Sequence, residues 1–178
     1  MSRLGAINEI LHERYLDGNN FLIEADIDNK GIRFEMRRKI VAKAGLNYTL
    51  YKFDAQDSIF PYFKATGIDN LKKMCDYVMF VEDGNHLFIF LIELKKGLDS
   101  AKKQLEAGEC FTNYIIATIK RLNNEFEFTD ANLHYRKIRI SESQSKKSTL
   151  KKGLLIHNSG VIDHQHPEIF ILNEYLSY

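Results

Sequence analysis

Three charged side chains at the ends of two apolar runs are the residues of this chain best suited to chemistry. The segment that contains them runs from Cys75 to Gly97, CDYVMFVEDGNHLFIFLIELKKG, and the charged residues in question are Asp76, Glu93 and Lys95. An unpaired charge in apolar surroundings costs several kcal/mol, roughly, unless an opposite charge, a metal ion or a shifted pKa relieves it. Two carboxylates with a lysine beside them are suited to cation-assisted hydrolysis.

The same segment predicts the element that would bring these side chains together. Two apolar, aromatic or β-branched runs, Val78 to Val81 and Leu87 to Ile92, are separated by the turn residues Glu-Asp-Gly-Asn. This pattern is typical of a β-hairpin. Since side chains alternate between the faces of a strand, Glu93 and Lys95 should project from one face. We expect the two runs to pair antiparallel in a mixed central sheet.

Two neighbouring carboxylates would supply hard oxygen ligands, which suit Mg²⁺ or Mn²⁺ rather than zinc. Such a cation can bind a phosphate oxygen, lower the pKa of a bound water and stabilise the leaving alkoxide. The Lys95 ammonium could orient the attacking water or offset charge on the phosphorane. The alternative is a structural salt bridge between Glu93 and Lys95 or Lys96, with Asp76 an ordinary residue at the start of a strand.

One Asp near a strand start, followed by Glu-x-Lys on the next strand, resembles the PD-(D/E)XK nuclease superfamily, which has the restriction-endonuclease-like fold. Asp76 and Glu93-Leu94-Lys95 carry the resemblance, and Cys75 stands where the family name has proline. The resemblance implies an αβββαβ core, with a mixed central sheet flanked by helices. It also implies that Asp76 and Glu93 bind Mg²⁺ or Mn²⁺ and that the chain hydrolyses phosphodiester bonds.

The resemblance implies two further site residues. Members of the superfamily often place a glutamine in the first turns of the following helix, and Gln104 fits that position. The stricter glutamine-to-tyrosine form of this motif fails, because the fourth residue on is Gly108. The superfamily also commonly takes an acid from its first helix. We favour Glu13 for this role, and Glu9 and Glu35 remain alternatives.

The coarse pattern of the chain agrees with this order of elements. Apolar spacing predicts a first helix over 2–15, and a second helix from Asp99 or Ser100 to about Leu122. The predicted strands outside the hairpin are 21–26, 32–40, 48–53, 133–140, 153–156 and 168–172. The expected fold is therefore α/β (α+β), with an αβββαβ core and extra strands at both ends.

Length and composition indicate one domain over residues 1–178. With 178 residues and 44% hydrophobic content, the chain can bury a sizeable core, and no Gly/Ser-rich linker divides it. No apolar run approaches the roughly 18 residues of a membrane span, and no signal-peptide pattern is visible, so we expect a soluble, cytoplasmic protein. Cys75 and Cys110 are too few for a disulfide framework.

The positive charge is clustered although the net charge is only +1. Residues 136–152 hold seven Lys or Arg against one acid. Such patches are the footprint of phosphate-backbone contact, although charge runs are more often solvated faces. The lysines that we predict to contact nucleic acid are Lys96, Lys102, Lys103, Lys146, Lys147, Lys151 and Lys152.

A second motif in the sequence resembles a metal-binding site but is weaker. His164 and His166, with Asp163, have the spacing of a zinc-binding pair, but no further ligand of fixed spacing accompanies them. A loop before Pro167 is the simpler interpretation.

The leading hypothesis is a metal-dependent nuclease that cleaves phosphodiester bonds in DNA, with RNA less favoured. By analogy with the superfamily, it would serve as a defence or restriction effector and work as a homodimer or with partner subunits. The alternative is a catalytically degenerate module of the same fold that binds nucleic acid or a protein partner.

Overall fold

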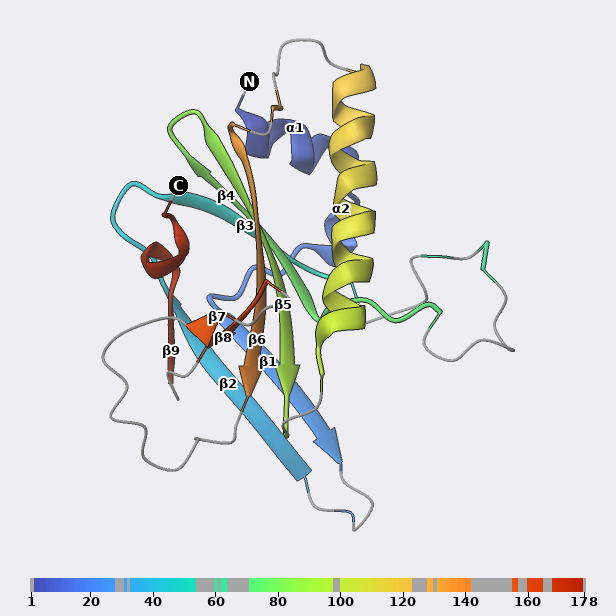
Figure 1. The fold of residues 1–178 in the computed structure, drawn as a ribbon, viewed down its shortest axis with the longest axis vertical. Helices are drawn as coiled ribbons and strands as arrows, with labels where there is room; N and C mark the ends of the chain where they lie inside the picture. Colours follow the sequence, from blue (N-terminus) through green and yellow to red (C-terminus); the bar gives the residue numbers. More distant parts are fainter. Residues whose placement is uncertain are drawn as a thin grey trace.

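The computed structural model describes residues 2–27, 31, 33–53, 60, 62–63, 71–97, 100–122, 128–129, 131–141, 155–156, 160–164 and 168–177. Within these residues the chain forms two α-helices and two mixed β-sheets (Figure 1). The predicted mixed α+β class is confirmed.

The larger sheet has six strands in the order β3-β4-β5-β6-β8-β7. Its first half is an antiparallel meander of β3 (Asn47–Lys52), β4 (Tyr77–Asp83) and β5 (His86–Lys95). Its second half consists of β6 (Leu133–Ser141), parallel to β5, β8 (Val161–His164), parallel to β6, and β7 (Leu155–Ile156), antiparallel to β8. The predicted antiparallel pairing of the hairpin in a mixed sheet is confirmed.

The hairpin of β4 and β5 closes through a two-residue turn. Asp83 pairs with His86, so that Gly84 and Asn85 form the loop, and Gly84 has a φ of 56°. Two-residue hairpin turns require positive φ, which glycine adopts without steric cost. In β5 every residue from 87 to 94 is buried. A strand covered on both faces has a continuous apolar run rather than an alternating one.

Both α-helices pack on one face of the larger sheet. Helix α2 (Lys102–Leu122) begins after Ser100, whose Oγ accepts a hydrogen bond from the Lys102 N–H at 3.3 Å. Its buried stripe is Leu105, Gly108, Thr112, Ile115, Ile116 and Ile119, whereas Leu122, at its end, is 63% exposed. Helix α1 (Arg3–Ile10) contributes Leu4, Ala6 and Ile7 to the same core. Neither helix in the described part of the chain has the length and apolar character to cross a membrane.

The second sheet covers the opposite face. It has the order β1-β2-β9, with β1 (Phe21–Ile27) antiparallel to β2 (Arg33–Val41), and β2 parallel to β9 (Ile169–Ile171). Exposed and buried residues alternate along β2, because one face packs on the larger sheet and the other meets solvent. A short 3₁₀ turn, η2 (Leu172–Tyr175), follows β9 and buries Leu172 and Tyr175.

Two expectations about the fold are wrong. The first helix ends at Ile10 rather than Tyr15, because Leu11 takes extended backbone angles and a separate 3₁₀ turn, η1 (Glu13–Tyr15), follows. The segment expected to be a loop around His164 begins as strand β8.

The close contact of α2 with the start of β4 gives a stability prediction. A Cβ on Gly108 would lie 2.6 Å from the Cys75 Sγ and 3.3 Å from the Leu91 Cδ2. Gly→Ala inside a helix normally gains about 1 kcal/mol from helix propensity. Here Gly108→Ala should instead lower the free energy of unfolding by about 1–3 kcal/mol, because the site is overpacked. Denaturant unfolding measures the change.

The matched control is the same substitution in a Cys75→Ala background, which removes the sulfur atom. Gly108→Ala should cost markedly less stability there, since contacting residues couple in a double-mutant cycle. Equal destabilisation in both backgrounds would refute the packing explanation.

Candidate active site

The two predicted carboxylates meet where the pairing of β4 and β5 ends. Tyr77 opposite Ile92 is the last pair of the ladder, and Asp76 directly precedes β4. Beyond that pair, side-chain carboxylates accept the hydrogen bonds that link the two strands. The Asp76 N–H donates to the Glu93 Oε2 at 3.2 Å, and the Leu94 N–H donates to the Asp76 Oδ2 at 2.6 Å. Asp76 is 8% exposed and Glu93 is 3% exposed. Each carboxylate therefore anchors the opposite strand.

Lys95 completes this group. Its Nζ lies 2.5 Å from the Glu93 Oε1, and its side chain is 22% exposed. Glu93 and Lys95 alternate with Leu94, so they share the sheet face on which Leu91 approaches Gly108 of α2. The structure thus brings together the three residues singled out from the sequence, and the ion pair of Glu93 and Lys95 is present.

Burial and charge act in opposite directions on Glu93. Burial raises the pKa of the Glu93 carboxyl group, while the hydrogen bond and charge of Lys95 and the Asp76 N–H lower it. The negative charge of Glu24 raises the pKa of Glu93 further. Burial also raises the pKa of the Cys75 thiol, and the nearby Glu93 and Asp76 charges add to that rise. Cys75 is therefore a poor nucleophile and serves as a packing residue.

Glu24 is a further acid that the sequence did not single out. It is half-buried on β1 in the second sheet, which covers the face opposite α2, and its negative charge raises the pKa of Glu93 from there. Its signal in the sequence is an acid inside the apolar strand FLIEADI, the same kind of signal that identified Glu93.

The sequence favours Glu13 as an additional acid of the site, with Glu35 among the alternatives. Glu13 is exposed on η1 rather than on the first helix, so the reason for choosing it is wrong. Glu35 has a side chain that is 46% exposed on β2, with its Oε2 3.6 Å from the Arg33 guanidinium.

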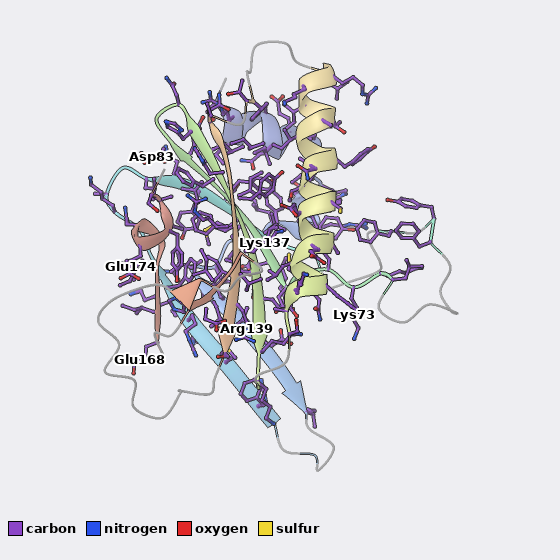
Figure 2. All side chains as sticks on the ribbon, in the orientation of Figure 1. Lys73, Asp83, Lys137, Arg139, Glu168 and Glu174 are labelled. Atoms are coloured by element: carbon purple, nitrogen blue, oxygen red, sulfur yellow. The ribbon has the colours of Figure 1, made fainter. Side chains whose placement is uncertain are left out.

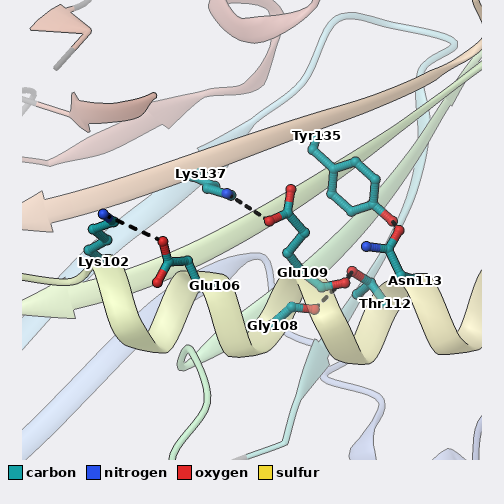
Figure 3. A network of polar contacts seen from close by, with 8 residues as sticks. All are labelled: Lys102, Glu106, Gly108, Glu109, Thr112, Asn113, Tyr135 and Lys137. Atoms are coloured by element: carbon teal, nitrogen blue, oxygen red, sulfur yellow. Dashed lines mark hydrogen bonds and ion pairs between the residues drawn. The ribbon is translucent and has the colours of Figure 1, made fainter. Parts of the chain in front are cut away.

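The other predicted site residues flank the group. Gln104 is half-buried in the first turn of α2, on the sheet face that carries Glu93. Lys103 is exposed, and Lys102 is 56% exposed, with its Nζ 3.7 Å from the Glu106 Oε1 (Figure 3). The exposed Lys96 places its Nζ 5.2 Å from the centre of the Phe34 ring. The remaining predicted lysines, Lys146, Lys147, Lys151 and Lys152, lie outside the described residues.

A polar network joins α2 to β6 next to the carboxylates. The Lys137 Nζ lies 2.7 Å from the Glu109 Oε2, and the Tyr135 hydroxyl donates to the Asn113 Oδ1 at 2.7 Å (Figure 3). These bonds hold the helix against β6 along its polar side.

A second ion pair follows on the neighbouring strands. Arg139 is the register partner of Glu93 and lies nearer than Lys137 to the end of β6 (Figure 2). Its guanidinium binds Asp163 of β8 through two bonds of 2.7 Å each. Bidentate pairs of this kind hold both side chains in a fixed geometry. The ion pair therefore joins β6 to β8, on the strand next to Glu93.

His164 has a structural role. It is 3% exposed, its Nδ1 lies 2.5 Å from the Tyr175 hydroxyl, and its Nε2 lies 2.8 Å from the Ile169 carbonyl oxygen. His166 lies outside the described residues. In the part of the chain that the structure describes, no three or more His, Cys, Asp and Glu side chains are grouped so as to hold a metal ion.

Searches of protein-family models, curated proteins and solved structures found no match to this chain.

The raised pKa of Glu93 predicts how stability depends on pH. A carboxyl group whose pKa is higher in the folded state stabilises the fold most below its ordinary value of 4.5 and loses that contribution as pH rises through the raised value. Gln mimics the protonated side chain. The free energy of unfolding of the parent relative to Glu93→Gln should therefore fall as pH rises above 4.5.

Denaturant unfolding of both proteins at a series of pH values measures this difference. Glu106→Gln, which removes a carboxylate that is 48% exposed, is the matched control. A difference that stays constant or grows with pH would contradict the assigned burial of Glu93.

Proposed function

We propose that this chain is a metal-dependent nuclease that hydrolyses phosphodiester bonds. The observation that carries the proposal is the bonding of two buried carboxylates, Asp76 and Glu93, to one another's strands, with the Lys95 Nζ 2.5 Å from Glu93. Fixed positions of this kind suit a catalytic group, because preorganised charges need not rearrange during the reaction.

The donor set fits a hard divalent cation. Mg²⁺ is usually held by one or two carboxylates together with water and substrate phosphates, rather than by a complete protein cage. Asp76 and Glu93 would hold Mg²⁺ or Mn²⁺, and Glu24 is near enough to add negative charge to the site. When bound, such a cation activates water for attack and stabilises the charge of the leaving group.

Lys95 would contribute an ammonium group in a fixed position. The ion pair holds its ammonium against Glu93 while the side chain keeps 22% of its surface exposed. The ammonium can thus meet a phosphate at the surface, orient the attacking water by a hydrogen bond and offset negative charge that builds up on the phosphorus centre. Gln104, in the first turn of α2, would contact the same substrate.

The order of the elements supports the restriction-endonuclease-like αβββαβ core. Helix α1, the meander of β3, β4 and β5, helix α2 and the parallel strand β6 follow that order. Strands β1 and β2 would then be an insertion after α1, and β7 to β9 an extension at the C-terminal side. We propose DNA as the substrate in preference to RNA, and a defence role as a homodimer or with partner subunits, on the resemblance alone.

The alternative function is a binding module without catalysis. One observation favours it: the Lys95 ammonium and the backbone N–H groups of Asp76 and Leu94 already bind the two carboxylates within the protein. Such contacts can stabilise a hairpin end without a cation. The module would then bind nucleic acid or a protein partner through its basic surface.

Substitutions at the three central residues separate these functions. Asp76→Asn and Glu93→Gln keep the shape but remove negative charge, so each should abolish cleavage of supercoiled plasmid and single strands with Mg²⁺ or Mn²⁺. Lys95→Ala should lower the cleavage rate by about 10²- to 10³-fold, as expected for removal of one preorganised electrostatic interaction. Gel assays of time courses measure the rates.

Glu174→Gln on η2 is the matched control and should cleave at the parent rate. Circular dichroism spectra confirm that each variant is folded. Should all three substituted proteins cleave as fast as the parent, the catalytic assignment is wrong.

The cluster of lysines between residues 146 and 152 of the sequence gives a separate prediction about binding. Replacing Lys146, Lys147, Lys151 and Lys152 with Ala should weaken affinity for duplex DNA about equally across sequences. The slope of log affinity against log salt should become shallower by roughly 0.9 for each phosphate group that the variant no longer binds. Fluorescence anisotropy at several salt concentrations measures both quantities.

Cleavage at saturating DNA should survive these four changes, because none of the four lysines is among the residues proposed to hold the cation or to act on the phosphate. An unchanged salt slope would show that the segment does not bind the phosphate backbone, and would favour a protein-docking role for it.

A further inference from the structure

A continuous chain of aromatic rings joins the end of β3 to α2 and then reaches the surface. The ring of Phe53, which directly follows β3, lies 5.0 Å from Phe111 of α2, and Phe111 lies 5.7 Å from Phe60. Phe60 in turn contacts Phe63 at 5.6 Å, and Phe63 contacts Tyr62 at 4.8 Å. We call these five residues the aromatic chain.

The exposure of the rings increases along the aromatic chain. Phe53 is 3% exposed, Phe111 and Phe60 are half-buried, Phe63 is 39% exposed and Tyr62 is 73% exposed. The inner rings therefore belong to the core, while the outer pair lies open to solvent. Large aromatic surfaces held open in this way usually mark a binding site.

Helix α2 carries one residue of the aromatic chain, Phe111, and one residue of the candidate active site, Gln104. Phe111 and Gln104 are seven residues apart, so they share one flank of α2, about 10 Å apart along its axis. Between them, Gly108 packs against Cys75, the neighbour of Asp76. A nucleic-acid strand that is bound at the carboxylates and follows this flank of α2 would therefore lead toward the aromatic chain.

Cationic side chains are present on the segments next to these rings in the sequence and on α2. Lys103 is exposed on α2, the helix that carries Phe111, and Lys73, labelled in Figure 2, is exposed three residues before Asp76 in the sequence. At the inner end, the guanidinium carbon of Arg14 lies 4.6 Å from the centre of the Tyr15 ring, which is 5.2 Å from Phe53. Aromatic faces combined with cations are the features that bind single-stranded nucleic acid without sequence preference.

We propose that Tyr62 and Phe63 form a stacking site for unpaired nucleobases, so that the substrate is single-stranded nucleic acid or a duplex with locally unpaired bases. The link to substrate choice rests on the proposed nuclease function, whereas the stacking itself needs no catalysis. Bases inside an intact duplex are stacked on one another and offer no free face. Each stacked base should raise affinity by about 5- to 150-fold.

The experiment compares three labelled probes by fluorescence anisotropy in EDTA, which prevents cleavage. The probes are a single-stranded oligonucleotide, the same strand with several abasic positions, and the intact duplex. The full-length parent should bind the complete single strand at least about fivefold more tightly than the abasic strand. The double variant Tyr62→Ala/Phe63→Ala should lose this preference and bind both strands equally.

Tyr62→Phe is the matched control, because it keeps the ring and removes only the hydroxyl group. It should retain the preference for the base-containing strand. Since Tyr62 and Phe63 are the exposed end of the aromatic chain, their replacement should leave the unfolding transition unchanged, which circular dichroism checks.

Two results would overturn the stacking site. One is that the parent shows no preference for the complete strand, because it binds both strands equally or binds neither. This result is expected if the rings contact a protein partner instead. The other is a double variant that keeps the parent's preference. A parent that prefers complete strands but cleaves nothing with Mg²⁺ or Mn²⁺ would support the stacking site and contradict the nuclease function.

Discussion

The reciprocal bonding of Asp76 and Glu93 is the interaction on which the site depends. At this point the backbone ladder of β4 and β5 stops, and two side chains continue it by accepting N–H groups from the opposite strand. Both carboxylates are buried, so the removal of either would leave a polar group without its partner in apolar surroundings. The Lys95 ammonium offsets part of the cost of keeping Glu93 charged.

The two layers that cover the larger sheet create these conditions. Helices α1 and α2 bury one face, and β1, β2 and β9 bury the other. Burial from both sides raises the pKa of Glu93, and the second sheet also brings Glu24 within electrostatic reach of it. The same packing brings Cys75 close to α2, so that a Cβ on Gly108 would have no room beside the Cys75 sulfur atom. The candidate site is therefore a product of the tertiary structure, although its residues are local in sequence.

The parts of the fold that depend on neighbouring residues were predictable from the sequence. The hairpin follows from two apolar runs around a Gly-containing turn, and α2 follows from a buried stripe after Ser100. The parallel pairing of β2 with β9 was not predictable, because it joins residues such as Ile40 and Phe170 that are far apart in the chain. Glu24 was missed for the same reason, since only the packing of the second sheet brings it near Glu93. Glu13 was chosen from a helix that ends before it, at Ile10.

The central claim is that Asp76 and Glu93 together hold a divalent cation, and a titration with Mn²⁺ followed by carbon NMR of the side-chain carboxyl groups tests it most directly. Mn²⁺ is paramagnetic and broadens the signals of the groups that it contacts. We expect the Asp76 and Glu93 signals to broaden together at the lowest Mn²⁺ concentrations, while those of exposed acids such as Glu174 stay sharp. Broadening that begins at exposed acids and spares Asp76 and Glu93 would contradict the claim.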